Sequence, residues 1–121
     1  MAHTVMIVED DDDNALLMEK ILNKKGYEIT RFADGESAVR YCTDHTPELI
    51  LMDVTLPGID GFKTSEQIKG SGIATNTPIV IISAHPKEEI ENKVNLTNLD
   101  YLSKPYTPDQ LRNTVDRYFQ D

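Results

Sequence analysis

The sequence lacks the features that mark disulfide-bonded, membrane-spanning and secreted proteins. It has one cysteine, Cys42, which excludes an internal disulfide framework. No apolar run approaches the roughly 20 residues that a membrane-spanning helix needs. The amino-terminal residues MAHTVMIVED also lack the basic and then apolar order of a signal peptide. We therefore expect a cytoplasmic protein that does not enter the membrane.

Basic residues are also few. The chain has 12 Lys and Arg against 21 Asp and Glu, which gives a formal net charge of −9. Nucleic acids and anionic membrane surfaces bind clustered Lys and Arg, so this balance argues against both as direct partners. Five of the acids are consecutive, from Glu9 to Asp13, so much of the excess belongs to one segment. Cations, metal ions and basic protein surfaces are left as candidate partners.

Linkers, sequence repeats and low-complexity tracts are absent as well. A chain of 121 residues that is 39% hydrophobic and 27% charged is typical of one ordinary globular domain. We therefore expect residues 1–121 to form a single domain.

Four short apolar runs recur along the chain at wide spacing. Continuous apolar runs of this length are typical of strands that are buried on both faces of a parallel sheet. The segment from Tyr27 to Phe32 mixes polar residues with Ile29 and is predicted to be an edge strand. The four apolar runs are Val5–Val8, Leu49–Met52, Ile79–Ile82 and the shorter Tyr101–Leu102.

Helical patterns separate these predicted strands. A first helix has one apolar face and stops at Gly26, and Asp60 is predicted to cap a third helix that ends at Gly70. Thr107, Pro108 and Gln110 form the capping pattern that begins the last helix. The apolar residues that mark the helices are Leu17, Met18, Ile21 and Leu22; Ala38, Val39, Tyr41 and Cys42 within Glu36–Asp44; Phe62 and Ile68; Ile90 and Val94 in a weaker, polar fourth helix; and Leu111, Val115, Tyr118 and Phe119, which should point inward.

This alternation predicts an α/β fold of five βα units, a doubly wound parallel sheet with helices on both faces. The carboxyl ends of parallel strands share one edge, and ligands bind there. Polar residues follow each of the four apolar runs, so they should gather at this edge although they are far apart in sequence. They are Glu9 and Asp10, Asp53, Ser83, and Ser103 with Lys104.

The chemistry of these residues favours a metal ion and a phosphoryl group. Three carboxylates close together repel one another, so at least one would have a raised pKa unless a cation joined them. Oxygen ligands favour Mg²⁺, Mn²⁺ or Ca²⁺ over zinc or copper. An ammonium and a hydroxyl beside such an ion suit a phosphoryl oxygen, and an aspartate can be the nucleophile of a phosphoryl transfer.

Four motifs carry a family resemblance. They are Val8-Glu9-Asp10-Asp11, the run from Leu49 to Gly61 that contains Asp53 and Pro57-Gly58, Ile82-Ser83-Ala84, and the run from Asp100 to Tyr106 that contains Lys104-Pro105. In this order and spacing the sequence resembles a response-regulator receiver domain, of the CheY-like type, over nearly all of its length. The resemblance implies a flavodoxin-like sheet with strand order 2-1-3-4-5.

The resemblance also implies a role for each site residue. Asp53 would accept a phosphoryl group from a phosphohistidine on a sensor histidine kinase or a histidine phosphotransfer protein. Asp10, Asp53 and the backbone carbonyl of Thr55 would hold Mg²⁺, with Mn²⁺ as a substitute, and Glu9 would act mainly through bound water. Lys104 would pair with the phosphoryl oxygens.

Signalling would depend on Ser83 and Tyr101. Ser83 would move to hydrogen-bond the phosphoryl group and draw Tyr101 inward, although the residues alone fit Tyr101 equally well as a core side chain. The Lys104–Pro105 bond would be cis. The domain would catalyse only its own phosphorylation and dephosphorylation, and would act as a monomer or a phosphorylation-dependent dimer.

Some positions differ from the commonest forms of the family. Glu9 replaces an aspartate, which should preserve function, and Tyr106 stands where phenylalanine is usual. Thr55 and His85 occupy two variable positions at which phosphoryl lifetime is tuned. Residues 92–100 lack the usual Ala-Gly stretch, which bears on the fourth helix and on partner choice.

Other interpretations explain fewer of the residues. Asp11, Asp12 and Asp13 are interpreted as solvated acids that cap a helix. A haloacid-dehalogenase-like phosphatase also uses a strand-end aspartate, but it needs a second aspartate where Thr55 stands. A phosphorylation-independent interaction module would keep the fold without the chemistry, and the complete set of site residues argues against it.

Overall fold

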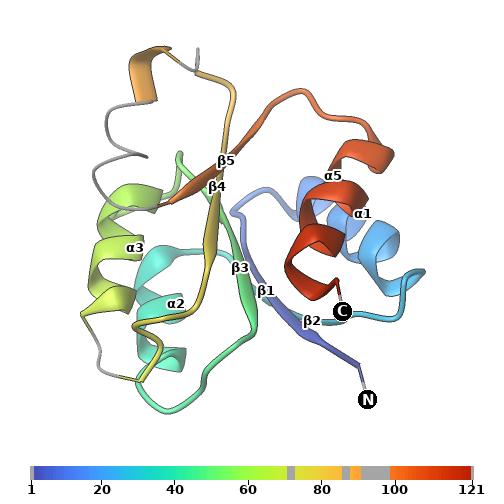
Figure 1. Cartoon of the computed structure of the whole chain (residues 1–121). Helices are drawn as coiled ribbons and strands as arrows, with labels where there is room; N and C mark the ends of the chain where they lie inside the picture. The colour runs from blue at the N-terminus through green and yellow to red at the C-terminus, as the bar shows by residue number, and fades with distance from the viewer. Residues whose placement is uncertain (1, 71–72, 86–87, 91–98, 121) are drawn as a thin grey trace.

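Five parallel strands form the centre of the protein. The computed structural model describes residues 2–70, 73–85, 88–90 and 99–120. The strands are β1 (Thr4–Val8), β2 (Glu28–Phe32), β3 (Leu49–Asp53), β4 (Ile79–Ser83) and β5 (Asp100–Ser103). They pair in the order β2-β1-β3-β4-β5 (Figure 1), which confirms the predicted order 2-1-3-4-5.

The burial of each strand follows its place in the sheet. Every residue of β3 and β4 is buried, as expected for the continuous apolar runs that they contain. β2 and β5 lie at the two edges, and none of their residues is fully buried. The prediction that the segment from Tyr27 to Phe32 contains an edge strand is therefore confirmed.

The pairing register brings the carboxyl ends of the strands to one level. The pairs nearest that edge are Val8 with Met52, Asp53 with Ile82, and Ser83 with Ser103. Glu9 and Lys104 follow β1 and β5 directly. The polar residues that come after the apolar runs therefore share one edge of the sheet.

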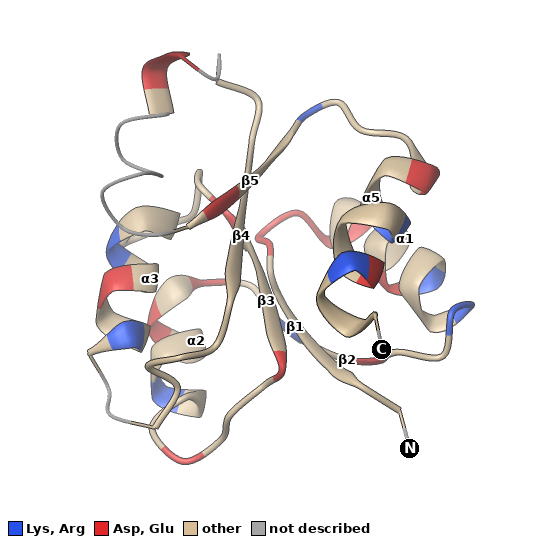
Figure 2. Cartoon of the chain, viewed as in Figure 1, with Lys and Arg blue, Asp and Glu red and all other residues tan. Residues whose placement is uncertain are grey.

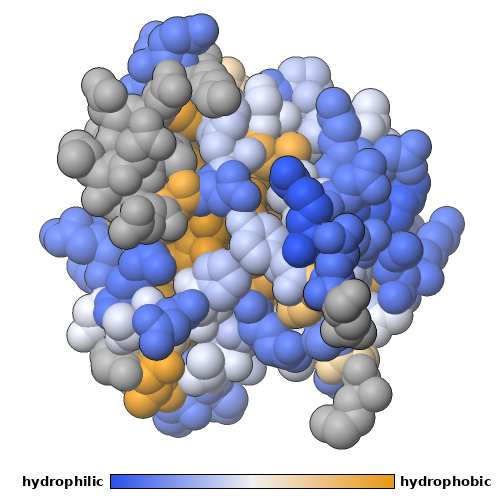
Figure 3. Space-filling model, in the orientation of Figure 1, coloured by the Kyte–Doolittle hydropathy of each residue, from blue (hydrophilic) through white to orange (hydrophobic). Residues whose placement is uncertain are grey.

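Helices cover both faces of the sheet. α1 (Asp12–Asn23) and α5 (Pro108–Asp116) lie on one face, and α2 (Gly35–Tyr41) and α3 (Gly61–Lys69) lie on the other (Figure 1). Successive side chains of a strand point to opposite faces, so Ile7 packs in the core beneath α1 and α5, and Met6 in the core beneath α2 and α3. A short 3-10 helix, η1 (Arg117–Phe119), follows α5. α5 buries Leu111 and Val115, and its outer surface is hydrophilic (Figure 3).

Side-chain caps determine where the helices begin. Asp60 accepts a hydrogen bond from the backbone amide of Lys63, and Thr107 forms a reciprocal capping box with Gln110, as predicted. Asp11 caps α1, and Asp12 and Asp13 lie exposed in its first turn, which agrees with their interpretation as capping acids. Asp34 caps α2 in the same way.

The prediction that Leu17 shares the apolar face of α1 is wrong. Leu17 is 56% exposed and its neighbour Leu16 is 50% exposed. The buried face instead joins Ala15 to Met18, Ile21 and Leu22. Leu17 lies at the margin of this face, about 100° around the helix from Met18, and the packing of α1 buries the side that contains Ala15 and Leu22 instead.

Two other helices differ from the sequence pattern. α2 ends at Tyr41, before the predicted Asp44, and Cys42 that follows it is buried as a small apolar residue, as predicted. Residues 88–90 are helical and Ile90 is buried, but Val94 and most of the predicted fourth helix lie outside the described residues. Tyr118 and Phe119 point toward the core but are only partly buried.

Within the described ranges, none of the helices has the length and apolar character that a bilayer crossing requires.

Candidate functional site

Three carboxylates meet at the carboxyl edge of the sheet. Glu9 follows β1, Asp10 follows Glu9, and Asp53 ends β3, and one oxygen from each lies within 4.8 Å of the others. Glu9 and Asp53 are only 3% and 7% exposed, whereas Asp10 is exposed. Figure 2 shows the loop between β1 and α1 as a red, acidic segment beside the ends of the central strands. The cluster is therefore buried on one side and open on the other.

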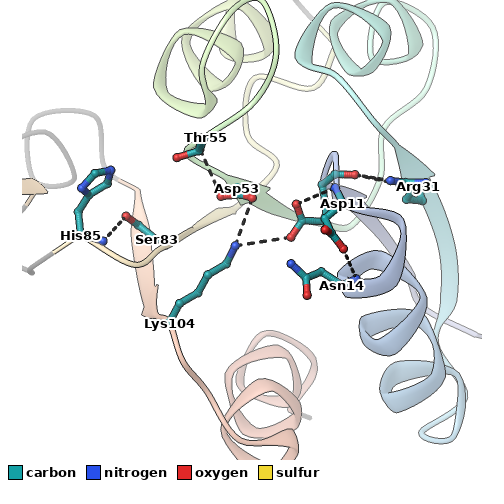
Figure 4. Close-up of polar contacts among 9 residues, drawn as sticks. Asp11, Asn14, Arg31, Asp53, Thr55, Ser83, His85 and Lys104 are labelled. Atoms are coloured by element: carbon teal, nitrogen blue, oxygen red, sulfur yellow. Dashed lines mark hydrogen bonds and ion pairs between the residues drawn. The ribbon is translucent and has the colours of Figure 1, made fainter.

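Lys104 is the cation that contacts this cluster in the described part of the chain. Its Nζ lies 3.2 Å from Asp53 Oδ2 and 3.5 Å from Glu9 Oε1 (Figure 4). The backbone amide of Lys104 donates to the carbonyl of Ser83 at 2.8 Å, which extends the pairing of β4 and β5 to the site. The Lys104–Pro105 peptide is cis, as the resemblance implied.

The electrostatics show that one ammonium does not balance the buried acids. Burial and the neighbouring Asp53 carboxylate raise the pKa of Glu9 to about 7, despite the opposing effect of Lys104. Burial alone would lower the pKa of Lys104, but the charges of Asp53 and Glu9 outweigh it and raise that pKa. Burial, with the same two carboxylates, raises the pKa of Tyr106 to about 12. The site therefore carries an excess of negative potential.

This donor set fits a hard divalent cation. All of the converging ligand atoms are carboxylate oxygens, the kind of ligand that Mg²⁺ and Mn²⁺ prefer. One ligand, Asp10, is exposed, so an ion could keep bound water and still reach Glu9 and Asp53. The amide of Thr55 donates to Asp53 Oδ1 at 3.2 Å, which places the Thr55 backbone beside the same carboxylate. Cation binding would also relieve the repulsion that raises the pKa of Glu9.

Close packing brings α3 up to the end of β3. Gly61, the first residue of α3, donates its backbone amide to the carbonyl of Val54 at 2.9 Å. A Cβ at Gly61 would collide with the backbone oxygen of Asp53, so only glycine allows this approach. The Asp60 cap and Gly61 together hold the loop that carries Asp53 and Thr55.

Ser83 and Tyr101 both hydrogen-bond the backbone of His85. Ser83 is buried at the end of β4, and its Oγ accepts a hydrogen bond from the backbone amide of His85 at 3.0 Å (Figure 4). Tyr101, half-buried on β5, donates its hydroxyl to the backbone carbonyl of His85 at 3.1 Å. The residue pair that the sequence associated with switching is therefore joined through one loop residue.

Sequence reasoning missed Arg31 as a site residue. Arg31 of β2 donates two hydrogen bonds to the backbone carbonyl of Glu9 and one to the side chain of Asp12. Its signal in the sequence is weak, since it is one basic residue near the end of a half-polar predicted strand. Only the pairing of β1 with β2 brings it to the acidic loop.

Comparison with known proteins agrees with this geometry. The profile of the family described as response regulator receiver domain matches residues 5–116. The chain belongs to this family. Receiver domains are signalling domains of two-component systems. This member has a buried acidic cluster at the end of a five-stranded parallel sheet.

Individual relatives cover the receiver domain to different extents. The chain is 30% identical over 122 residues to the polar-differentiation response regulator DivK of Brucella anthropi, and the match covers 100% of this chain and 99% of DivK. It is 33% identical over 116 residues to the uncharacterized transcriptional regulatory protein YrkP of Bacillus subtilis, a match that covers 95% of this receiver chain but 48% of YrkP. The chain thus spans about half the length of YrkP and nearly all of DivK.

A solved structure shows the same fold with a metal. The receiver domain of a sensor histidine kinase from Pseudomonas aeruginosa is 28% identical to this chain, with a TM-score of 0.88, and the match covers 98% of each chain. That structure holds a magnesium ion in its active site cleft. The receiver described here gathers Glu9, Asp10 and Asp53 at the carboxyl edge of its own sheet.

Proposed function

We propose that residues 1–121 act as one receiver domain that accepts a phosphoryl group on Asp53. The observation that carries the proposal is the placement of Asp53, whose buried carboxylate lies with Glu9 and Asp10 in one acidic cluster and 3.2 Å from Lys104. The donor is a phosphohistidine of a sensor histidine kinase or a histidine phosphotransfer protein, the partner class expected for this family. The domain is a phosphoacceptor that passes on a signal, and its site of action is the cytoplasm.

The transfer needs little beyond position and charge. An Asp53 oxygen attacks the phosphorus, a P–O bond forms, and the bond from phosphorus to the donor nitrogen breaks. Asp10, Asp53 and the Thr55 carbonyl would hold Mg²⁺ directly and Glu9 mainly through bound water, and the ion would supply positive charge that offsets the charge of the phosphoryl oxygens. Lys104, which contacts Asp53 in the resting protein, pairs with those oxygens.

Phosphorylation adds a charge of about −1.5 to −2 to the edge of the sheet. Ser83 leaves the His85 amide, which it now contacts at 3.0 Å, and hydrogen-bonds the phosphoryl group. The hydrogen bond between Tyr101 and the His85 carbonyl couples that movement to β5, and Tyr101 moves inward. The surface at β5 then changes, and it contacts a downstream protein or a second copy of the receiver.

A phosphodonor protein must reach Asp53 from the open side of the site. Leu17 of α1 is exposed and lines a groove of about 320 Å³ with Lys104, Pro105 and Tyr106, and its neighbour Leu16 is exposed as well. An exposed apolar patch of this kind suits contact with another protein. Its position supports transfer from a protein donor.

The test is phosphorylation by a small donor. The protein is incubated with acetyl phosphate and Mg²⁺, and its intact mass is measured over time. We expect a gain of one phosphoryl group by the wild type, and none by Asp53→Asn or in EDTA. Equal phosphorylation of Asp53→Asn would show that Asp53 is not the acceptor, and steady hydrolysis of many phosphomonoesters would favour a phosphatase instead.

A further inference from the structure

Arg31 hydrogen-bonds the acidic segment Glu9–Asp13 from the side opposite Lys104 (Figure 4). Its Nε and Nη2 donate to the backbone carbonyl of Glu9, at 3.0 and 2.7 Å. Its Nη1 donates to the carboxylate of Asp12 at 2.9 Å. The guanidinium thus holds the loop at two points, one before and one after Asp10.

The contact falls on a backbone group that matters for the site. The carbonyl that Arg31 binds belongs to the peptide bond between Glu9 and Asp10, two of the three clustered acids. Fixing this peptide fixes the directions in which both side chains leave the backbone. Hydrogen bonds from an ionised donor are stronger than neutral ones, and the Arg31 side chain is only 22% exposed, which limits screening by water.

The loop needs such a restraint because its charges repel. Five acids are consecutive from Glu9 to Asp13, and within this run the Glu9 carboxylate accepts a hydrogen bond of 3.3 Å from the Asp11 amide. Ligands that are already oriented bind with a smaller loss of conformational entropy than ligands that must be ordered on binding. Residues that orient metal ligands without touching the ion commonly change affinity by an order of magnitude or more.

We propose that Arg31 is a positioning residue of the divalent-metal site, which orients Glu9 and Asp10 through their shared peptide. This inference rests on the proposed function, because it concerns the same Mg²⁺ site. Arg31 has two opposing effects on a cation. Its positive charge repels the ion, whereas its hydrogen bonds preorganise the ligands. The sign of the change on substitution therefore separates the two roles.

The experiment measures Mg²⁺ binding to metal-free protein by calorimetry. Arg31→Gln should weaken binding about tenfold, even though it removes a charge that repels the ion. Arg31→Lys keeps the charge but cannot bind the Glu9 carbonyl and the Asp12 carboxylate with a rigid fork of donors. It should therefore also weaken Mg²⁺ binding, but by less than Arg31→Gln. The matched control is Arg40→Gln, which removes one charge from α2, where Arg40 contacts Ser37, and should bind Mg²⁺ as the wild type does or slightly more tightly.

A second readout does not need the metal. In metal-free protein, amide hydrogen exchange of residues 9–12 should be faster in Arg31→Gln than in the wild type, and unchanged in Arg40→Gln. Raising the Mg²⁺ concentration should restore the phosphorylation rate of Arg31→Gln with acetyl phosphate, because its Asp53 and Lys104 are intact. Thermal melts establish that each variant is folded. If Arg31→Gln does not fold, Mg²⁺ binding by Arg31→Lys decides whether Arg31 positions the ligands.

The failures of the two proposals differ. If the wild type binds Mg²⁺ and is phosphorylated, but Arg31→Gln binds Mg²⁺ as tightly or more tightly, then Arg31 does not position the ligands. Unchanged Mg²⁺ binding by Arg31→Lys together with weakened binding by Arg31→Gln would likewise contradict a role for the guanidinium hydrogen bonds. A wild type that neither binds Mg²⁺ nor accepts a phosphoryl group would overturn the proposed function itself.

Discussion

Among single residues, Glu9 shows most clearly the repulsion between the buried acids of the site. Its carboxylate is 3% exposed and lies beside Asp53, and the pKa of Glu9 rises to about 7 because of burial and that neighbour. Lys104 contacts both acids and offsets only part of the repulsion. We expect a cation that joins the cluster to offset this repulsion.

We predict that Glu9→Gln has opposite effects on stability and on metal binding. The substitution removes a buried negative charge while keeping an oxygen that accepts from the Asp11 amide, so it should raise the free energy of unfolding in EDTA by about 1 kcal/mol. It should also weaken Mg²⁺ binding, because a carboxylate is lost. Urea unfolding in EDTA and calorimetric Mg²⁺ titration measure the two effects. A destabilised metal-free variant would contradict this account of the cluster.

At the scale of the element, the candidate site lies in the loops that join the ends of the strands to the helices after them. The caps Asp11 and Asp60 begin α1 and α3; Asp11 directly follows Glu9 and Asp10, and Asp60 follows the strand that ends at Asp53. Gly61 lets α3 approach the backbone of Asp53. The geometry of the cluster therefore depends on how these helices start as well as on the acids themselves.

The cap of α2 gives a prediction that does not involve the cluster. Asp34 accepts a hydrogen bond from the amide of Ser37 at 2.7 Å, so Asp34→Ala should lower the free energy of unfolding by about 1 kcal/mol at pH 7. Asp34→Asn keeps the acceptor and should cost much less. The same hydrogen bond lowers the pKa of Asp34 from its usual 3.8.

The sign of the pH effect follows from that lowered pKa. The charged cap contributes stability that is fully present above pH 3.8 and is lost as the pH falls through the lower value in the folded state. The advantage of the wild type over Asp34→Asn should therefore shrink at the acid end. Urea unfolding of both proteins at pH 7, 5 and 3 measures it, and an advantage that stays constant over this range would contradict the assignment.

At the scale of the whole molecule, the candidate site is linked to the edge strand β5 through the end of β4. β4 brings Ser83 to the site, and the His85 backbone links Ser83 to Tyr101 of β5. These two hydrogen bonds form the route by which we propose that a change in charge at Asp53 alters β5. Such coupling requires two arrangements of the β4–β5 end that differ in their contacts with the phosphoryl group.

Because an ion at the cluster needs strands β1 and β3 in register, metal binding should stabilise the whole fold. Mg²⁺ at about 100 times its Kd should raise the free energy of unfolding by about 2.7 kcal/mol. The effect should disappear in Asp10→Asn, whose exposed side chain has little part in the core. Scanning calorimetry with and without Mg²⁺ measures the shift. Equal stabilisation of Asp10→Asn would place the ion elsewhere.

Much of the architecture could be predicted from local patterns alone. The apolar runs from Val5, Leu49 and Ile79 identified the buried strands, because such runs are typical of parallel strands covered on both faces. Since the carboxyl ends of parallel strands share an edge, the residues after each run could be expected to meet. Glu9, Asp53 and Lys104 do meet there.

The sequence by itself determined the elements, their order and the chemistry at the strand ends, because periodicity, caps and residue type act locally. Only the tertiary structure decided how the elements are rotated and which remote groups touch. Leu17 is exposed because packing set the rotation of α1, and Arg31 reaches the Glu9 carbonyl because β2 pairs beside β1. Such contacts join residues far apart along the chain, so no local pattern records them.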